Sequence, residues 1–205
     1  MIIGVLALQG DFYAHARCLD KTGTAWKLIK APEHLENIDG LILPGGESTA
    51  MLKLMEPRGM LSVLKKFHRS GKPMFGTCAG LILLAKEVLP AQESLGCIGI
   101  SVERNAYGRQ SDSFIETGAS DKNELGTGKI EMVFIRAPKI SRLGKNVKPL
   151  AFHGRQPVLV RQGNILASTF HPELSEGGSP VHEYFLKMVY KKQASLNPGQ
   201  RVVRS

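Results

Sequence analysis

The chain has 205 residues, of which 42% are hydrophobic and 22% charged, with 22 glycines, 11 prolines and three cysteines. This length and apolar content allow a sizeable core, which excludes a disordered chain and a fold that depends on disulfides or metals. No apolar run reaches the roughly 18 residues that cross a membrane, and no basic leader opens the sequence. We therefore expect a cytoplasmic protein with no membrane attachment.

The formal net charge of +9 raises the question of nucleic-acid binding. Five basic residues and no acidic ones follow position 186, so much of the excess lies near the C-terminal end. Aromatic residues make up only 6% of the chain and no arginine-rich helix is evident, so nucleic acid is not the expected partner. Residues 193–205 are expected to form a basic, disordered tail, or else to present a docking face for an acidic protein.

The first 90 residues alternate short apolar runs with amphipathic stretches. The apolar runs predict buried strands over Ile2–Leu8, Ala25–Ile29, Gly40–Leu43 and Lys72–Gly76. The helices predicted between and after them are Phe12–Thr22 with Asp11 as its cap, a stretch from Ser48 or Thr49 to about Phe67 interrupted at Pro57, and Ala79–Val88. This alternation predicts a parallel sheet covered by helices on both faces.

Residues 98–168 have a different pattern, with short β-like runs separated by glycine and asparagine. The expected strands are Phe114–Thr117, Glu131–Ile135, Pro157–Val160 and Asn164–Thr169, followed by a closing helix over Pro180–Tyr190. Because no repeat or linker divides the chain, we predict a single α/β domain over residues 1–192.

The segment Gly76–Gly80, with the sequence Gly-Thr-Cys-Ala-Gly, carries the strongest chemical signal. It falls between a predicted strand and a predicted helix and fits the G-x-S-x-G nucleophile elbow, with Cys78 in place of serine. The two glycines allow a turn that crowds backbone against backbone. A thiol at a helix N-terminus is also activated by the unpaired N–H groups and the helix dipole. The alternative is a small buried cysteine in a tight turn.

A cysteine nucleophile needs a base, and the base needs a group that orients it. The segment His171-Pro172-Glu173 offers both, because the proline holds His171 extended and residues i and i+2 of an extended chain point to the same side. Glu173 can then accept the N–H of His171 and leave the other ring nitrogen facing Cys78. Taken alone, this segment would be a turn with a capping carboxylate.

The glycine-rich loop Pro44–Thr49 lies between a predicted strand and helix. No lysine follows its glycines and Glu47 would repel a phosphate, so phosphate binding is not expected. The backbone N–H of Gly46 could instead face an oxyanion formed during acyl transfer, with the N–H of Ala79 as second donor. A simple helix cap is the alternative interpretation.

The remaining candidates lack a supporting motif. Arg104 and Arg136 follow predicted strands and could bind a substrate carboxylate. Cys18 and Cys97 are expected in the core. The other histidines are expected to be surface or packing residues: His15, His34, His68, His153 and His182.

Taken together, these motifs resemble a class I, triad-type glutamine amidotransferase domain, and more closely the glutaminase subunit of pyridoxal 5′-phosphate synthase, the PdxT family. The resemblance runs from about residue 2 to 192. It is carried by six segments in the same order and with similar spacing: Gly4–Gly10, Leu43–Thr49, Lys72–Gly80, Glu103–Gln110, Phe134–Pro138 and Phe170–Leu174.

The resemblance implies a flavodoxin-like, three-layer domain with a mainly parallel central sheet and an antiparallel extension. It implies hydrolysis of L-glutamine without a cofactor or metal, with Cys78 as nucleophile, His171 as base and acid, and Glu173 orienting His171. The residues it assigns to substrate binding are Gly46, Glu47, Ser48, Arg104, Ile135 and Arg136. It further implies that ammonia passes to a separate synthase subunit, which docks near Gln9 and Gly10 and activates the glutaminase.

Three rival interpretations remain at this level. The chain could be the glutaminase of another pathway, such as imidazole glycerol phosphate synthesis. The Glu-Ser-Thr sequence that follows Gly46 argues against this alternative. A cysteine peptidase or DJ-1-like hydrolase could share the sheet. A scaffold without catalytic activity could bind nucleic acid through its basic tail, which salt-dependent retention on DNA would reveal.

Overall fold

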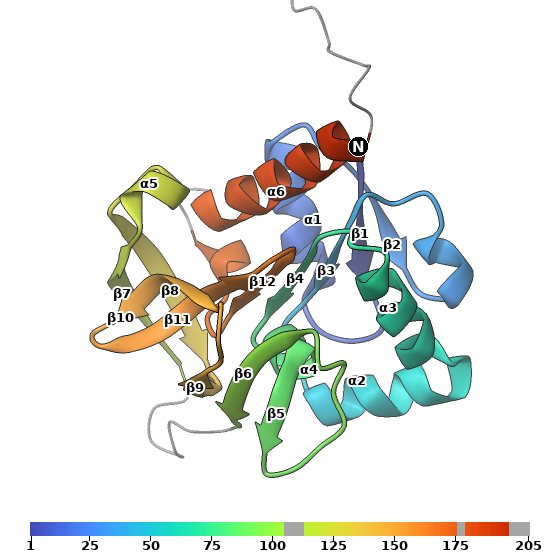
Figure 1. Ribbon diagram of the computed structural model, residues 1–205, viewed down its shortest axis with the longest axis horizontal. Helices are drawn as coiled ribbons and strands as arrows, with labels where there is room; N and C mark the ends of the chain where they lie inside the picture. Colours follow the sequence, from blue (N-terminus) through green and yellow to red (C-terminus); the bar gives the residue numbers. More distant parts are fainter. Residues whose placement is uncertain (105–112, 176–178, 197–205) are drawn as a thin grey trace, which may run out of the picture.

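A computed structural model describes residues 1–104, 113–175 and 179–196 of the chain (Figure 1). Its main feature is a nine-stranded mixed sheet, and a three-stranded sheet lies beside it. The strands of the large sheet, in spatial order, are β2 (Ala25–Ile29), β1 (Ile2–Leu6), β3 (Gly40–Leu43), β4 (Met74–Thr77), β12 (Ile165–Ser168), β11 (Gln156–Gln162), β10 (Lys148–His153), β7 (Ser113–Ser120) and β8 (Lys129–Ile135).

The first five strands of this order, β2-β1-β3-β4-β12, run parallel to one another. This is the 2-1-3-4-5 order of flavodoxin-like folds, with β12 as the fifth strand. The helices that connect and cover them are α1 (Phe12–Lys21), α2 (Ser48–Met55), α3 (Met60–Arg69), α4 (Ala79–Leu84) and α6 (Pro180–Leu196). Because ligands bind at the carboxyl ends of such strands, this edge is where the site is expected.

Two hydrophobic clusters show that the parallel strands are buried on both faces. Side chains alternate along each strand, so Leu41 and Leu43 of β3 pack with α2, α3 and α4, whereas Ile42 packs with α1 and α6. Figure 1 shows α1 and α6 together on one side of the sheet, opposite α2 and α3. The predicted α/β class, with its three layers, is therefore confirmed.

The other four strands of the large sheet form the antiparallel extension. From β12 through β11, β10, β7 and β8, every neighbouring pair is antiparallel. The three-stranded sheet pairs β5 (Ala85–Leu89) with β6 (Ile98–Glu103) in parallel and β6 with β9 (Lys139–Leu143) antiparallel. The short helical segments are η1 (Pro32–Leu35), η2 (Glu56–Arg58), α5 (Lys122–Leu125) and η3 (Pro172–Leu174).

The structure corrects several predicted boundaries. The helix predicted over Ala79–Val88 ends at Leu84, and the chain continues as strand β5, because residues 85–89 pair with β6. Glu47, not Ser48 or Thr49, caps α2 through hydrogen bonds from two backbone N–H groups. Asp11 caps α1 as predicted, accepting a hydrogen bond from Ala14 N at 3.1 Å.

The closing helix α6 begins at the predicted Pro180 but continues to Leu196, past the expected end at Tyr190. Its last residues, 193–196, belong to the segment expected to be a disordered tail, and residues 197–205 lie outside the described part. Across the residues that the structure describes, no helix combines the length and apolar character that crossing a bilayer requires.

Candidate active site

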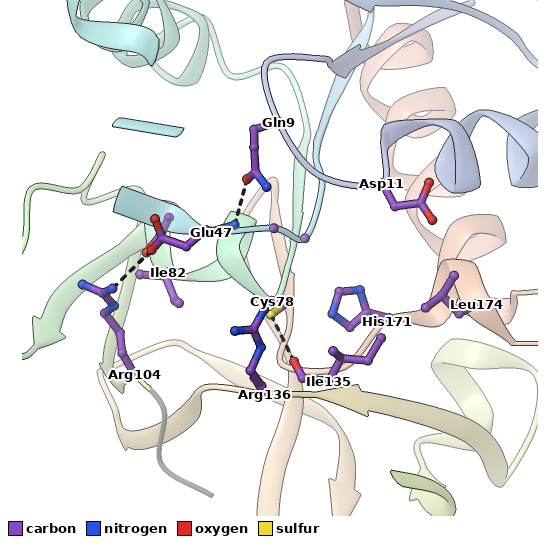
Figure 2. Close-up of a pocket in the computed structure, with 13 residues that line it drawn as sticks. Gln9, Asp11, Glu47, Cys78, Ile82, Arg104, Ile135, Arg136, His171 and Leu174 are labelled. Atoms are coloured by element: carbon purple, nitrogen blue, oxygen red, sulfur yellow. Dashed lines mark hydrogen bonds and ion pairs between the residues drawn. The ribbon is translucent and has the colours of Figure 1, made fainter. Parts of the chain in front are cut away.

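A pocket of about 290 Å³ opens at the carboxyl ends of the parallel strands (Figure 2). The loops after β1, β3, β4 and β12 all contribute to it, as the doubly wound topology predicts. Its size is at the small end for ligand pockets, which suits a metabolite of amino-acid size. The lining residues are Gln9, Asp11, Gly45, Gly46, Glu47, Ser48, Cys78, Ile82, Arg104, Ile135, Arg136, His171 and Leu174.

Cys78 lies at a sharp turn between β4 and α4. Its backbone has φ of 47° and ψ of −102°, a strained conformation that non-glycine residues rarely adopt and that nucleophile elbows impose. A Cβ on Gly76 would lie 2.5 Å from the backbone carbon of Gly80, and a Cβ on Gly80 would lie 2.0 Å from the oxygen of Leu43. The two glycines are therefore required by backbone crowding, as the sequence predicted.

His171 and Glu173 have the geometry of an oriented base. The Nδ1 atom of His171 lies 2.8 Å from Oε1 of Glu173, and the Glu173 side chain is only 1% exposed. Gly45 packs directly against the imidazole, since a Cβ there would approach Cε1 of His171 to 2.2 Å. The ring is thus held between the glycine loop and a buried carboxylate. Because Nδ1 is engaged, Nε2 is the nitrogen left for Cys78.

The electrostatics of the site favour a proton on His171. Burial lowers the pKa of this imidazole, but hydrogen bonds with Cys78 and Glu173 and the charges of both groups outweigh burial and raise the pKa to about 10. Burial likewise raises the pKa of Glu173, yet the neighbouring imidazoles of His15 and His171, through hydrogen bonds and electrostatic attraction, hold that pKa well below its usual range. A carboxylate with two histidine neighbours therefore stays ionised.

The glycine loop is tied to its surroundings through Glu47. The carboxylate of Glu47 accepts hydrogen bonds from the backbone N–H of Thr49 and Ala50, at 3.0 and 2.7 Å, and from the hydroxyl of Thr49. Burial works against ionisation, but these donors and Arg104 lower the pKa of Glu47. The backbone N–H of Glu47 donates to the side-chain oxygen of Gln9 at 2.8 Å, which joins this loop to the turn after β1 (Figure 2).

Two arginines line the pocket. Arg104, at the end of β6, donates to Thr49 Oγ1 at 3.1 Å and lies 3.4 Å from Oε1 of Glu47. Arg136 follows β8 with a positive φ of 42°. The preceding carbonyl, that of Ile135, lies 3.9 Å from the sulfur of Cys78. The rim therefore offers two cations for a substrate carboxylate.

The structure brings most of the predicted site residues into this one pocket. Three of them do not line it, because Glu173 lies behind His171, and Gly10 and Ala79 lie behind the residues beside them. Residues 105–112, which carry the rest of the segment after Arg104, lie outside the described residues. The pocket-lining residues to which the sequence had assigned no role in the site are Asp11, Gly45, Ile82 and Leu174. Gly45 and Leu174 lie within segments that the sequence had marked, Asp11 is the predicted helix cap, and Ile82 follows Cys78 by one helical turn.

The histidine prediction was incomplete. His15 and His182 are 0% and 1% exposed, and His15 lies 3.4 Å from the carboxylate of Glu173. No local motif marks them, although His15 follows the capping residue Asp11 by one helical turn. Cys97 is buried, which raises its pKa to about 12, and Cys18 is only partly buried. Neither thiol lines the pocket.

Within the described ranges, no cluster of three or more histidine, cysteine or acidic side chains could hold a metal ion.

The fold and the site together define a class of protein, the triad-type glutamine amidotransferases. The defining features are a strained cysteine, an imidazole oriented by a carboxylate, and a glycine loop at the end of a flavodoxin-like sheet. The chain belongs to the SNO glutamine amidotransferase family, whose family model matches residues 5–191. A solved structure titled as a glutamine amidotransferase superposes with a TM-score of 0.85 at 47% identity, covering 93% of this chain and all of the other.

Curated relatives carry a more particular name. The pyridoxal 5′-phosphate synthase subunit PdxT of Koribacter versatilis is 53% identical over 190 residues, which are 92% of this chain and 96% of the relative. The protein of the same name from Thermosipho africanus is 49% identical over 195 residues, covering 93% of this chain and all of the relative. These similarities favour the expected class over a DJ-1-like hydrolase or a glutaminase of imidazole glycerol phosphate synthesis.

Proposed function

We propose that this chain hydrolyses L-glutamine to L-glutamate and ammonia and delivers the ammonia to the synthase subunit of pyridoxal 5′-phosphate synthase. The observation that carries the proposal is the Glu173–His171 pair, with its 2.8 Å contact, beside the strained Cys78 in one pocket. This arrangement matches the requirements for acyl transfer through a thioester. The names of the relatives support the pathway and the partner.

The reaction begins once Cys78 has transferred its thiol proton to His171, which leaves a thiolate. The thiolate attacks the side-chain amide carbon of glutamine, a C–S bond forms, and the carbonyl π electrons move to oxygen. When the tetrahedral intermediate collapses, the C–N bond breaks and His171 gives its proton to the departing ammonia. Water, deprotonated by His171, then attacks the thioester, the C–S bond breaks, and glutamate leaves with the cysteine regenerated.

The oxyanion of both tetrahedral intermediates needs hydrogen-bond donors. We assign this role to the backbone N–H groups of Gly46 and Ala79, because Gly46 lines the pocket and Ala79 follows the nucleophile directly. Losing one such donor typically lowers the rate about 10²–10³-fold. The loop therefore controls the rate as well as the shape of the pocket.

Recognition of the substrate's α-amino and α-carboxylate groups is assigned to the rim. Arg104 and Arg136 supply cations for the carboxylate, and Glu47 supplies an anion near the position of an ammonium group. Ser48 and the carbonyl of Ile135 offer further polar groups in the pocket. A free amino acid, with both charges present, suits this rim better than a peptide.

The turn at Gln9 and Gly10 is the proposed point of activation by the synthase subunit. Gln9 accepts a hydrogen bond from the N–H of Glu47, next to the proposed oxyanion donor Gly46. A Cβ on Gly10 would lie 1.8 Å from the carbonyl oxygen of Gly45, so this turn is in direct backbone contact with the glycine loop. A partner that moves the turn would therefore move the loop.

The proposal is tested by a glutaminase assay of the purified chain with and without a pyridoxal 5′-phosphate synthase subunit. Ammonia and the vitamer are measured together in the presence of the pentose and triose phosphates. We expect glutamine-dependent ammonia release to increase with the synthase subunit, together with formation of the vitamer. Ammonia release without vitamer formation would indicate a glutaminase of another pathway. If neither ammonia nor the vitamer is formed, the proposal is refuted.

The role of the nucleophile is tested by Cys78→Ala, with Cys97→Ala as the matched control. We expect Cys78→Ala to lower glutamine turnover by about 10⁴-fold or more, because no other thiol lines the pocket among the described residues. Cys97→Ala should retain turnover near that of the unchanged protein. Substantial turnover by Cys78→Ala would contradict the thioester mechanism.

A further inference from the structure

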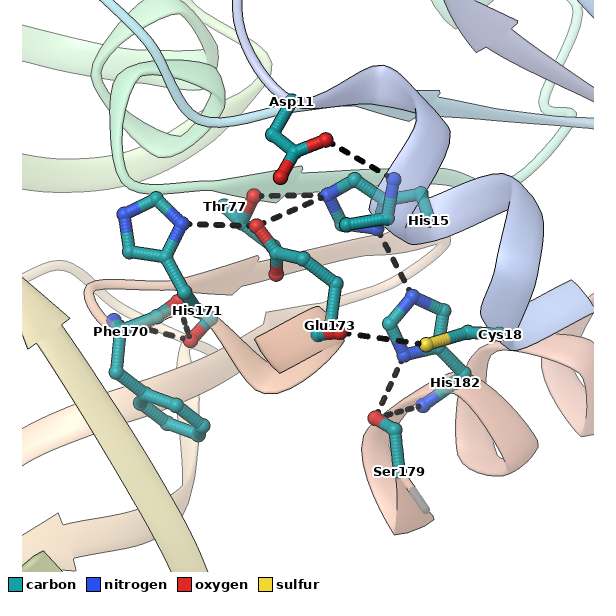
Figure 3. Close-up of polar contacts among 11 residues, drawn as sticks. Asp11, His15, Cys18, Thr77, Phe170, His171, Glu173, Ser179 and His182 are labelled. Carbon is teal, nitrogen blue, oxygen red and sulfur yellow. Dashed lines mark hydrogen bonds and ion pairs between the residues drawn. The ribbon is translucent and has the colours of Figure 1, made fainter. Parts of the chain in front are cut away.

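A chain of buried polar side chains continues behind Glu173, on the side away from the pocket (Figure 3). His15 of α1 lies with Nε2 at 3.4 Å from Oε1 of Glu173 and at 3.2 Å from the hydroxyl of Thr77. Its Nδ1 lies 2.9 Å from Nε2 of His182 in α6. The other ring nitrogen of His182, Nδ1, lies 2.6 Å from the hydroxyl of Ser179.

His15 therefore joins the two segments that carry the proposed triad. Thr77 immediately precedes Cys78, and Glu173 orients His171, yet these segments come from different parts of the sequence. The side chains of His15 and Thr77 are fully buried, and His182 is 1% exposed. Burying a pair of histidines away from solvent costs free energy unless each ring nitrogen has a hydrogen-bond partner.

The contacts of the Glu173 carboxylate are all concentrated on one oxygen. Oε1 faces both His171 and His15, whereas within the described ranges Oε2 has no hydrogen-bond partner. The orientation of this carboxylate thus depends on two imidazoles that approach Oε1 from different elements. If His15 were absent, His171 would be its only partner there.

A carboxylate can only accept hydrogen bonds, so Glu173 fixes the direction of donation along this row of side chains. Because Glu173 can only accept, a hydrogen bond from His15 to it requires a proton on Nε2 of His15, and with a neutral ring Nδ1 of His15 then accepts from Nε2–H of His182. Nδ1 of His182 then accepts the hydroxyl proton of Ser179, whose oxygen also accepts from the backbone N–H of His182 at 3.2 Å. Burial and the neighbouring His15 lower the pKa of His182 to about 3, which is consistent with a neutral ring.

We propose that His15 is a positioning residue of the glutaminase, which, supported by His182, holds the carboxylate of Glu173 so that His171 keeps its proton on Nδ1 and presents Nε2 to Cys78. The kinetic part of this inference rests on the proposed function. The titratable groups that face this carboxylate are His171 and His15, with His182 behind His15 and the thiol of Cys18 at 3.7 Å from the backbone carbonyl of Glu173.

A purely structural role is the competing explanation, and it makes different predictions. Both imidazoles contact the ring of Phe75 edge-on, with centroids 6.1 Å (His15) and 5.6 Å (His182) away, so they also contribute packing. A leucine at position 15 would keep much of that packing but would remove the N–H donor. A glutamine would restore a donor on a side chain of similar reach.

The experiment compares His15→Leu, His15→Gln and the matched control His153→Leu in the complex with the synthase subunit. His153 is also paired with a carboxylate, at 2.5 Å from Glu116, but neither residue lines the pocket. We expect His15→Leu to lower kcat about tenfold or more with KM within twofold, His15→Gln to recover part of the loss, and His153→Leu to leave both unchanged. An equal effect of all three variants, or an unchanged kcat in a folded His15→Leu protein, would overturn the proposal.

A second readout needs no glutamine turnover. The rate at which iodoacetamide alkylates Cys78 reports on the Cys78–His171 pair and is followed by mass spectrometry of the Cys78 peptide. We expect this alkylation rate at neutral pH to be lower in His15→Leu. In the unchanged protein, ¹H–¹⁵N NMR shows which ring nitrogens carry protons. A bare Nε2 on His15 would overturn the proposal even if no variant folds. If the unchanged complex lacks glutaminase activity, the proposed function fails while these two measurements still decide the role of His15.

Discussion

The two halves of the site differ in how much water reaches them. Cys78, His171 and Glu173 are 6%, 8% and 7% exposed, whereas the side chains of Glu47 and Arg104 on the rim are 51% and 20% exposed. Charges in the buried half interact through a medium of low effective dielectric, so each contact there strongly affects the protonation of its neighbour. On the rim, water and salt weaken the Glu47–Arg104 pair.

This difference separates the tasks of the site. In the proposed function, the buried half sets the protonation and orientation of the reacting groups, so changes there are expected in kcat. The rim is proposed to bind the α-amino and α-carboxylate groups of the substrate, so changes there are expected mainly in KM. Substitutions in the two halves should therefore have different sizes and different kinetic signatures.

Among the substitutions that leave the proposed nucleophile in place, the largest effect is expected for Glu173→Gln. The amide can turn its NH₂ group toward His171, which would leave Nδ1 as an acceptor and place the proton on the nitrogen that faces Cys78. We expect kcat to fall on the order of 10³–10⁴-fold with little change in KM, measured by ammonia release. Glu116→Gln, which changes a carboxylate paired with a surface histidine, is the control. A loss below tenfold would show that Glu173 does not set the tautomer.

Gly45→Ala should give the next largest effect. Its Cβ would lie 2.2 Å from Cε1 of His171, so the imidazole must move. A displacement of this kind can lower kcat about 10²-fold while the fold stays intact. Gly128→Ala is the matched control, because no atom lies within 4 Å of a Cβ at that position. Equal kcat values for the two variants would mean that the contact between the loop and His171 is not needed.

Arg104→Ala tests the rim. The substitution removes a cation from the pocket and the partner of Glu47 and Thr49, but leaves Cys78 and His171 in place. We expect KM for glutamine to rise about tenfold and kcat to change less than threefold, with Arg104→Lys intermediate. Arg142→Ala, which removes an exposed pair with Glu87, should leave both parameters unchanged. A fall in kcat as large as that of Gly45→Ala would end the distinction between the two halves.

The smallest effect is a pH dependence of stability. The pKa of His171 is about 10 in the folded state, above the value near 6.5 expected in the unfolded chain. Protonated His171 therefore stabilises the fold fully below pH 6.5, and this contribution is lost as the pH rises toward 10. We expect Tm to fall by a few degrees over this window, and by less in Cys78→Ala, which lacks the sulfur partner. The same slope in both proteins would show that the Cys78–His171 pair does not contribute.

The chemistry-bearing motifs could be predicted because each one is local. The elbow at Gly76–Gly80 follows from backbone crowding over five residues, and the His171-Pro172-Glu173 geometry follows from the extended conformation before a proline. The helix after Cys78 was predicted to be too long, because apolar residues at 79–88 satisfy helical spacing, whereas pairing of β5 with β6 makes the second part a strand.

Sequence alone therefore predicted the proposed nucleophile, its base, the orienting carboxylate and the alternation of strands and helices over the first 90 residues, since each is marked by a pattern of near neighbours in the chain. Tertiary structure alone decided that His15 and His182, separated by 167 positions, meet behind Glu173, and that Gly45 contacts His171. The physical reason is that such contacts are created by the order of the parallel strands and the packing of α1 against α6, which no local pattern of residues encodes.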